Sequence, residues 1–176
     1  SAGELMSTKL GAAWLQKRGF DIHWLDARKQ IVTIEQEGAK GYLSATALHD
    51  TDHSLIEKLQ ALDRQVVITQ GFIGSNVRGE TVLLGRGGSD TSAAYFAAKI
   101  QAAALEIWTD VPGLFTANPR LIPSARLLRV LDYEEAQELA TTGAKALHPR
   151  SIPPARKANI PVRVRSTYTP ELEGTT

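Results

Sequence analysis

Cysteine is absent from the 176-residue sequence, which excludes disulfide bonds and thiolate metal ligands and suits a reducing, cytoplasmic compartment. The sequence also lacks an apolar run long enough to span a bilayer, and it lacks the basic, apolar and small-residue regions of a secretion signal. An excess of one charge is missing too. The formal net charge is +1 and acids and bases are interspersed, unlike the clustered basic surface of a nucleic-acid binder. We therefore expect a cytoplasmic globular protein with neither a membrane nor a nucleic-acid partner.

Several catalytic and cofactor motifs are missing as well. There is no Gly-x-Ser-x-Gly elbow, no cysteine nucleophile, no P-loop and no Gly-x-Gly-x-x-Gly dinucleotide fingerprint, so acyl-transfer hydrolysis is unsupported. The histidines show no metal-ligand spacing. His49 and His53 are four residues apart, but they fall in a polar stretch without a companion ligand. We therefore assign no zinc site and no metal-binding residues.

The residues that are present favour a single α/β domain. The composition, 43% hydrophobic and 22% charged, is typical of a globular protein with a core. Apolar periodicity and turn residues predict helices at 4–17, 54–62, 91–104, 133–141 and 149–157. Short β-branched or alternating runs predict strands at 20–25, 31–34, 65–69, 81–84, 105–109 and 162–164. The alternation of strands and helices predicts a three-layer α/β/α sandwich with a mainly parallel sheet.

Two finer expectations concern the first half of the chain. The apolar run at 65–69 has the pattern of a strand that is buried on both faces. The glycine-containing stretch at 38–44 is predicted to be an exposed turn, and the glycines at 71, 74 and 79 predict a loop.

The sequence Gly-Arg-Gly-Gly-Ser-Asp at residues 85–90 joins a predicted strand to a predicted helix. In open α/β sheets ligands bind at the carboxyl ends of strands, where free N–H groups and the helix dipole attract anions. Arg86 could grip a carboxylate or phosphate through two hydrogen bonds, and Ser89 or Asp90 could cap the helix. The alternative is a tight turn with an ordinary cap and a solvated arginine. Three glycines in four positions, with an arginine between them, favour the ligand site.

Later segments contain further candidate ligand groups. Asp110 follows a predicted strand and could bind a nucleotide or its metal, although such a residue often bonds its own backbone in a turn. Phe115 could pack near a base, and Arg120 could reach phosphate oxygens or simply be solvated. Lys145 lies between two predicted helices, as a phosphate cation or an ordinary surface lysine. His148 is interpreted as a packing or capping residue.

Together these segments resemble the amino acid kinase family, and within it the aspartate kinases, over nearly the whole chain. The matching stretches are Gly-Glu-Leu-Met-Ser at 3–7, Val-Ile-Thr-Gln-Gly-Phe-Ile-Gly at 67–74, Leu-Gly-Arg-Gly-Gly-Ser-Asp at 84–90, Trp-Thr-Asp-Val-Pro-Gly at 108–113, Gly-Ala-Lys-Ala-Leu-His-Pro at 143–149 and Ile-Pro-Val-Arg-Val-Arg-Ser-Thr at 160–167. The Thr-Asp-Val-x-Gly element is shared by several kinases of this fold, whereas Gly-Arg-Gly-Gly-Ser-Asp points to aspartate as the substrate.

The resemblance implies that ATP, accompanied by Mg²⁺, and L-aspartate give ADP and 4-phospho-L-aspartate, in the first step of lysine, threonine and methionine biosynthesis. It implies that Arg86 holds the α-carboxylate of aspartate and that Glu4 binds its ammonium group. Gly88 and Ser89 would lie at the same, substrate-binding end of the cleft.

The resemblance also implies a nucleotide end lined by Thr109, Asp110, Phe115, Arg120 and Lys145. Arg86, Asp90 and Lys145 would then be the catalytic residues. A carboxylate is already nucleophilic at neutral pH, so catalysis would consist of positioning and charge neutralisation in an in-line phosphoryl transfer.

The sequence departs from the family pattern at its start. Nothing like the family's opening Lys-Phe-Gly-Gly-Thr-Ser strand occurs, and that strand supplies a phosphate-binding lysine. A start on a helix suggests a cut N-terminus, so we expect residues 1–176 to be a partial catalytic domain that lacks its first strand, its phosphate loop and the regulatory domain. This chain alone should be a weak or inactive catalyst. Its parent is expected to be an active homo-oligomer, open to fusion with a regulatory domain or a second pathway enzyme.

Two alternatives stay open. The first is another kinase of the same fold, acting on glutamate, acetylglutamate or a nucleotide; the arginine within the 85–90 turn argues against it. The second is a non-catalytic binding or assembly module with this fold.

Overall fold

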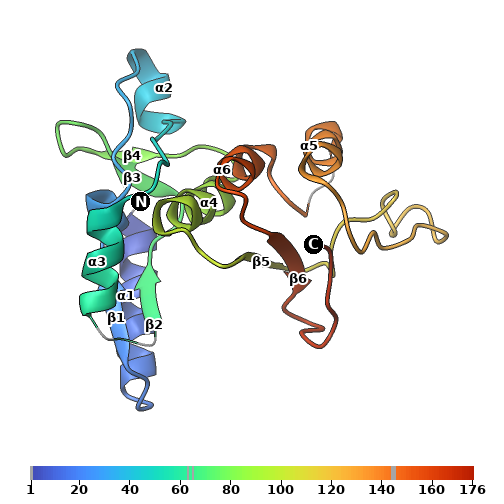
Figure 1. Cartoon of the computed structure of the whole chain (residues 1–176), viewed down its shortest axis with the longest axis horizontal. Coiled ribbons are helices and arrows are strands. Elements are labelled where there is room, and N and C mark those ends of the chain that lie inside the picture. Colours follow the sequence, from blue (N-terminus) through green and yellow to red (C-terminus); the bar gives the residue numbers. More distant parts are fainter. Residues whose placement is uncertain (1, 63, 65, 144–145) are drawn as a thin grey trace.

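The computed structural model describes residues 2–62, 64, 66–143 and 146–176. Over these ranges the chain is an α/β protein in which α4 and α6 lie between two strand pairs (Figure 1). The helices are α1 (Ala2–Gln16), α2 (Gly38–Leu43), α3 (His53–Ala61), α4 (Gly88–Ile100), α5 (Tyr133–Thr142) and α6 (Ile152–Lys157), with short 3-10 helices η1 (Ala27–Lys29) and η2 (Pro149–Ser151). The strands are β1 (Ile22–Leu25), β2 (Val66–Thr69), β3 (Ile73–Ser75), β4 (Thr81–Leu83), β5 (Leu105–Thr109) and β6 (Val162–Ser166).

The named strands pair two by two. β1 is parallel to β2, with Ile22 beside Val66, and β5 is parallel to β6, with Leu105 beside Val162. β3 and β4 form an antiparallel hairpin. Helices lie between the two members of each parallel pair in the sequence, because parallel neighbours need a crossover connection. The predicted α/β fold with mainly parallel pairing is therefore confirmed.

Helix α4 packs at the centre because its inner side carries small side chains. Ala94, Ala97 and Ala98 are at most 5% exposed, and they allow α4 to contact α3, α6 and β5. The main core cluster surrounds this helix and consists of Ala94, Ala97, Leu105, Ile107, Ala140, Leu147, Ile152, Ala155, Ile160 and Val164. Each buried methylene in such a core is worth about 0.8 kcal/mol. This packing fixes the direction of α4 and hence the place of its first turn.

Three sequence expectations were wrong in detail. Residues 38–44 are mostly exposed, as predicted, but they contain α2 rather than only a turn, and this helix contacts β4. The glycine-rich stretch after β2 contains β3, which finds its partner in β4. Strand β2 is only partly buried, with Val66 exposed at 39%. These outcomes depend on tertiary neighbours, which local patterns do not encode.

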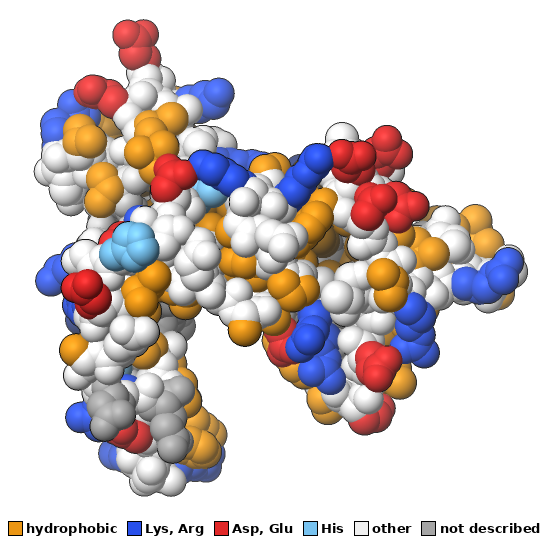
Figure 2. Space-filling view, viewed as in Figure 1, with side chains coloured by type: hydrophobic (Ala, Val, Ile, Leu, Met, Phe, Trp, Pro, Cys, Tyr) orange, Lys and Arg blue, Asp and Glu red, His pale blue; other side chains and the backbone are white. Residues whose placement is uncertain are grey.

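Charged side chains mark the surface between α5 and α6. Acidic side chains gather over α5 and basic ones over α6 in the space-filling view (Figure 2), and Arg156 forms an ion pair with Glu134 at 2.6 Å. The capping box of Asp132 and Glu135 starts α5. Across the part of the chain that the structure describes, no helix combines the length and apolarity needed to cross a bilayer.

Candidate functional site

The turn at residues 85–90 follows β4 and leads directly into α4. Gly85 and Gly87 have left-handed backbone angles, φ +78° and +63°, which glycine adopts without strain. Gly87 is the N-cap of α4 and offers no side-chain cap, so the prediction that Ser89 or Asp90 caps the helix is wrong. Instead, the N–H groups of Ser89 and Asp90 lie in the first helical turn, where no intrahelical carbonyl is available to them. The positive end of the helix dipole is thus open to an anion.

The same turn is also tightly packed, which explains its glycines. A Cβ on Gly85 would lie 2.7 Å from Ser44 Oγ, and one on Gly88 would lie 2.6 Å from the Phe72 ring. A Cβ on Gly87 would overlap the His148 ring. Larger residues at these three positions would displace the turn or its neighbours.

The predicted ligand groups of the turn are uncommitted. Arg86 and Ser89 are exposed, and within the described ranges the Arg86 guanidinium has neither a hydrogen bond nor an ion pair. Glu4 lies in the first turn of α1 and is half-buried. The buried Gln70 donates from Nε2 to Thr8 Oγ1 at 3.0 Å, one helical turn from Glu4. This bond ties α1 to the segment after β2.

That segment reaches the turn at Gly71 and Phe72, a contact that the sequence did not predict. A Cβ on Gly71 would lie 3.1 Å from Ser89 Oγ, so the two backbones are close. Phe72 has φ +71°, which is unusual for a bulky residue and stores strain of about 1–3 kcal/mol. Its N–H donates to Ser92 Oγ at 3.2 Å and its carbonyl accepts from the Leu84 N–H at 2.9 Å. Strain of this kind gathers at ligand-binding sites.

Asp90 faces His148 rather than the open side of the turn. Its Oδ2 accepts a hydrogen bond from the backbone N–H of His148 at 3.2 Å. Burial raises the pKa of Asp90, and this hydrogen bond opposes the rise. His148 Nδ1 in turn accepts from the Arg150 N–H at 3.2 Å and caps η2, which agrees with the predicted capping role. Burial lowers the pKa of His148, and the Asp90 carboxylate partly offsets the decrease.

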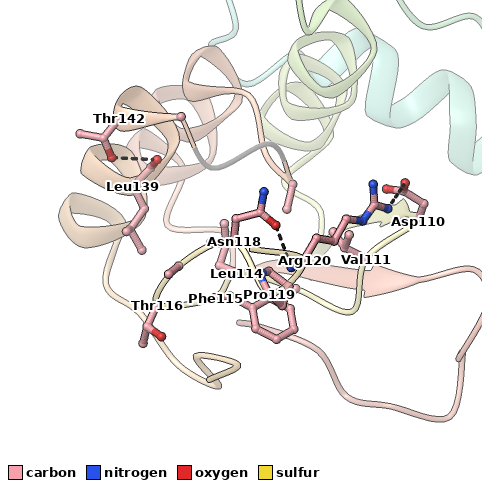
Figure 3. Close-up of a pocket in the computed structure, with 14 residues that line it drawn as sticks. Asp110, Val111, Leu114, Phe115, Thr116, Asn118, Pro119, Arg120, Leu139 and Thr142 are labelled. Carbon is pink, nitrogen blue, oxygen red and sulfur yellow. Dashed lines mark hydrogen bonds and ion pairs between the residues drawn. The ribbon is translucent and has the colours of Figure 1, made fainter. Parts of the chain in front are cut away.

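A pocket of about 410 Å³ lies beyond the carboxyl end of β5 (Figure 3). Asp110, Phe115 and Arg120, three of the residues expected at a nucleotide end, line it. The remaining wall is formed by Val111, Gly113, Leu114, Thr116, Ala117, Asn118, Pro119, Leu139, Thr142, Gly143 and Ala146. The contributions of Leu139 and Thr142 from α5 were not predicted, because no local signal brings α5 to this loop.

The polar groups of the pocket are loosely held. Arg120 pairs with Asp110 at 3.8 Å, and their side chains are 78% and 63% exposed. The Arg120 N–H donates to Asn118 Oδ1 at 3.0 Å (Figure 3). Thr109 does not line the pocket, but its Oγ1 donates to Asp110 Oδ1 at 3.2 Å. Lys145, the predicted phosphate cation, lies outside the described residues.

No metal ligand set accompanies these groups in the described ranges. Among those residues, there is no cluster of three or more His, Asp or Glu side chains that could hold a metal ion. Asp110 is the one carboxylate among the described residues that line the pocket.

Ligands of open α/β folds bind beyond the ends of strands, and both the start of α4 and the pocket after β5 follow a strand. The family model described as the amino acid kinase family matches residues 1–166. The chain therefore belongs to the amino acid kinase family.

Similar proteins within this family are aspartokinases. The chain is 43% identical over 176 residues to lysine-sensitive aspartokinase 3 of Escherichia coli, covering 99% of the chain and 38% of that protein. It is 41% identical to a bifunctional aspartokinase/homoserine dehydrogenase of Haemophilus influenzae, of which it covers 20%. The crystal structure of E. coli aspartokinase III in complex with aspartate and ADP matches 98% of this chain and 38% of the E. coli chain, with a TM-score of 0.85 and 41% identity. The chain thus spans about two fifths or less of the length of these relatives.

Proposed function

We propose that the protein containing this sequence is an aspartate kinase, which transfers the γ-phosphate of ATP to the side-chain carboxylate of L-aspartate. The observation that carries the proposal is the uncommitted Arg86 guanidinium beside the open start of α4. An arginine and helical N–H groups together suit a carboxylate ligand. The similarity to an aspartokinase whose crystal structure holds aspartate and ADP supports the same assignment.

At the amino-acid end, Arg86 would bind the α-carboxylate of aspartate, with Gly88 and Ser89 beside it. Gly88 is buried, and a Cβ there would lie 2.6 Å from the Phe72 ring, so glycine at this position lets the turn pack against Phe72. Glu4 would bind the ammonium group. Glu4 is a half-buried residue, and partial burial strengthens an ion pair relative to bulk water.

At the nucleotide end, ATP would occupy the pocket after β5. Phe115 would contact the base, Arg120 would reach phosphate oxygens, and Lys145 would neutralise the transferring phosphate. Thr109 would act through Asp110, which it orients. Because Asp110 is the one carboxylate among the described lining residues, Mg²⁺ would be held mainly by phosphate oxygens and water. Mg²⁺ would supply charge neutralisation on the phosphates.

The chemistry needs few protein groups. A side-chain carboxylate oxygen of aspartate attacks the γ-phosphorus, and the bond from that phosphorus to the β,γ-bridging oxygen breaks, giving ADP and 4-phospho-L-aspartate. No proton has to be removed from an ionised carboxylate, so no general base is required. Arg86 and Lys145 would hold and neutralise the reacting groups. Asp90, placed against His148, would organise the turn instead of contacting the reacting atoms.

We further propose that these 176 residues form part of a catalytic domain and catalyse the reaction weakly by themselves. The sequence has no Lys-Phe-Gly-Gly stretch to supply a second phosphate-binding lysine. Homo-oligomerisation and a cytoplasmic location remain predictions of the sequence. Fusion to a second enzyme is supported by the bifunctional relative, which carries homoserine dehydrogenase in its name.

Ligand titration calorimetry on the chain tests the substrate assignment. L-Aspartate should bind roughly 10-fold or more tightly than L-glutamate, because one extra methylene in a fitted site changes affinity by about that factor. Equal or tighter binding of L-glutamate, N-acetyl-L-glutamate or UMP would favour another kinase of this fold. Absence of binding by all four would favour a non-catalytic module.

Hydroxylamine trapping of acyl phosphate, with ATP, Mg²⁺ and L-aspartate present, tests the catalytic claim. Turnover should fall far below the roughly 1–10³ s⁻¹ of ordinary enzymes. Turnover within that range would contradict the proposed need for the additional lysine.

A further inference from the structure

One short segment of the chain contacts both ends of the proposed cleft. Gly143 and Ala146 line the pocket after β5. Two residues beyond Ala146, His148 lies against the 85–90 turn. Two residues span at most about 7 Å, so the contacts of Ala146 and His148 lie close together along the chain.

His148 holds the turn through two different contacts. Its ring covers Gly87 so closely that a Cβ there would overlap it. Its backbone N–H donates to Asp90 Oδ2 at 3.2 Å, which fixes the first turn of α4. The ring is itself oriented, because Nδ1 accepts from the Arg150 N–H, while the His148 carbonyl accepts from Ser151 Oγ at 2.6 Å.

Arg150 holds the other side of the same turn. Its guanidinium donates to the carbonyl of Leu84, the residue before Gly85, at 2.5 Å. It also donates to Ser44 Oγ at 3.2 Å and to the Ala45 carbonyl at 3.0 Å. The turn is therefore fastened at its beginning by Arg150 and at its end by His148.

We infer that His148 and Arg150 are positioning residues, which join the glycine turn and the pocket-lining loop into one unit and so couple the amino-acid and nucleotide ends of the cleft. This inference rests on the proposed function for the meaning of the two ends, but the mechanical link itself is independent of any ligand. Neither residue needs to touch a substrate. Through their contacts, a displacement of the glycine turn would also displace the pocket-lining loop.

Amide hydrogen exchange of the ligand-free chain, followed by NMR, tests the link. His148→Asn keeps an oxygen that can cap η2 but removes the ring from Gly87. We expect roughly 10-fold faster exchange, the factor for one lost net contact, both at the hydrogen-bonded amides of Gly88 and Thr91 in the turn and at 139–143. His53→Asn, at the exposed start of α3, is the matched control and should leave both regions unchanged.

Three outcomes would overturn the inference. Exchange in His148→Asn could stay unchanged, it could accelerate at the turn but not at 139–143, or it could accelerate equally in β1 and β2, which would indicate a general loss of stability. Asp90 variants provide a second check that keeps His148 intact. Asp90→Asn retains an acceptor for the His148 N–H and should behave as the wild type, whereas Asp90→Ala should reproduce the His148→Asn pattern.

A titration with L-aspartate tests the proposed function and the positioning role of His148 separately. Aspartate should protect residues 86–91 in the wild-type chain, and it should bind roughly 10-fold more weakly to His148→Asn. If the wild-type turn does not respond to aspartate, the proposed function fails, and the ligand-free exchange data still decide the link. If aspartate binds both chains equally, the positioning role of His148 is wrong while the proposed function stands.

Discussion

The two ends of the proposed cleft are built differently. The glycine turn is enclosed by Ser44, Phe72 and His148, and it leaves only Arg86 and Ser89 exposed for a ligand. The polar groups of the pocket after β5 belong to exposed loop side chains, and the Arg120 side chain is 78% exposed. The comparison teaches that the turn, the proposed amino-acid end, is tightly packed, whereas the pocket, the proposed nucleotide end, has exposed charged groups.

The largest effect should come from adding one methyl group to the enclosed turn. Gly87→Ala combines a left-handed φ of +63° with an overlap on the His148 ring, so it should destabilise the chain by roughly 2–4 kcal/mol. Gly143→Ala is the matched change at the pocket, where φ is +113° and, apart from the adjoining residues, no atom of the described part of the chain lies within 4 Å of the new Cβ. It should cost only about 1–2 kcal/mol. Equal losses in urea unfolding would show that packing does not distinguish the two ends.

Replacing Arg86 should weaken L-aspartate binding while leaving the stability of the chain nearly unchanged. Arg86→Ala should weaken L-aspartate binding roughly 10- to 100-fold, because a charge-assisted bidentate contact is lost. The free energy of unfolding should change by less than about 0.5 kcal/mol, since the side chain is exposed. The affinity of Arg86→Lys for L-aspartate should lie between those of the wild type and Arg86→Ala. Calorimetry and thermal unfolding together measure both quantities, and unchanged affinity in Arg86→Ala would remove the basis of the proposal.

The half-buried pair of Asp90 and His148 should give the stability of the chain a pH dependence that the groups of the open pocket do not. Burial lowers the folded-state pKa of His148 below its ordinary 6.5, so the stability linked to His148 is complete above that pH and is lost as the pH falls through the folded pKa. Burial raises the pKa of Asp90 above 3.8, so its contribution has the opposite sign: it is present below that pH and is lost as the pH rises through the folded pKa.

Melting temperatures measured from about pH 7.5 to about pH 5.5 check this sign. The wild-type chain should lose more stability over this range than His148→Asn, with His53→Asn as the control for removing a histidine. Asp90→Asn should be as stable as the wild type or slightly more stable near pH 7, because it removes a half-buried charge. A steeper pH dependence in His148→Asn than in the wild type would contradict the assignment.

The smallest effect on stability should come from the nucleotide end. Arg120→Ala breaks an exposed ion pair of 3.8 Å and should change the free energy of unfolding by less than about 0.5 kcal/mol. Its effect should appear instead in the binding of ADP with Mg²⁺, as a loss of roughly 10-fold. A clear loss of stability would mean that this loop is as firmly fixed as the turn.

Much of the fold could be predicted from local pattern. Strand β5 has the predicted bounds, 105–109, and its first four residues alternate between buried and exposed. Helix α5 and the left-handed Gly19 after α1 follow from capping and glycine chemistry. The pocket residues Asp110, Phe115 and Arg120 followed from their order after a strand, strengthened by the family resemblance.

The rest depends on contacts between distant segments. Gly87 caps α4 because the His148 ring, 61 positions later, leaves no room for a side chain, and residue spacing does not reveal this. The strained Phe72 is fixed by its contact with Gly88 and its bond to Ser92. Leu139 reaches the pocket only through the packing of α5. The helix cap at Gly87, the backbone strain at Phe72 and the pocket wall at Leu139 therefore all depend on tertiary contacts.

The most direct test of the two-ended cleft is a pair of NMR titrations on the ¹⁵N-labelled chain. L-Aspartate should shift the amide signals of Gly85, Gly87 and Gly88, and ADP with Mg²⁺ should shift those of Asp110, Phe115 and other residues that line the pocket. Shifts of the pocket amides by aspartate in place of the turn amides, or of the turn by ADP in place of the pocket, would contradict the account.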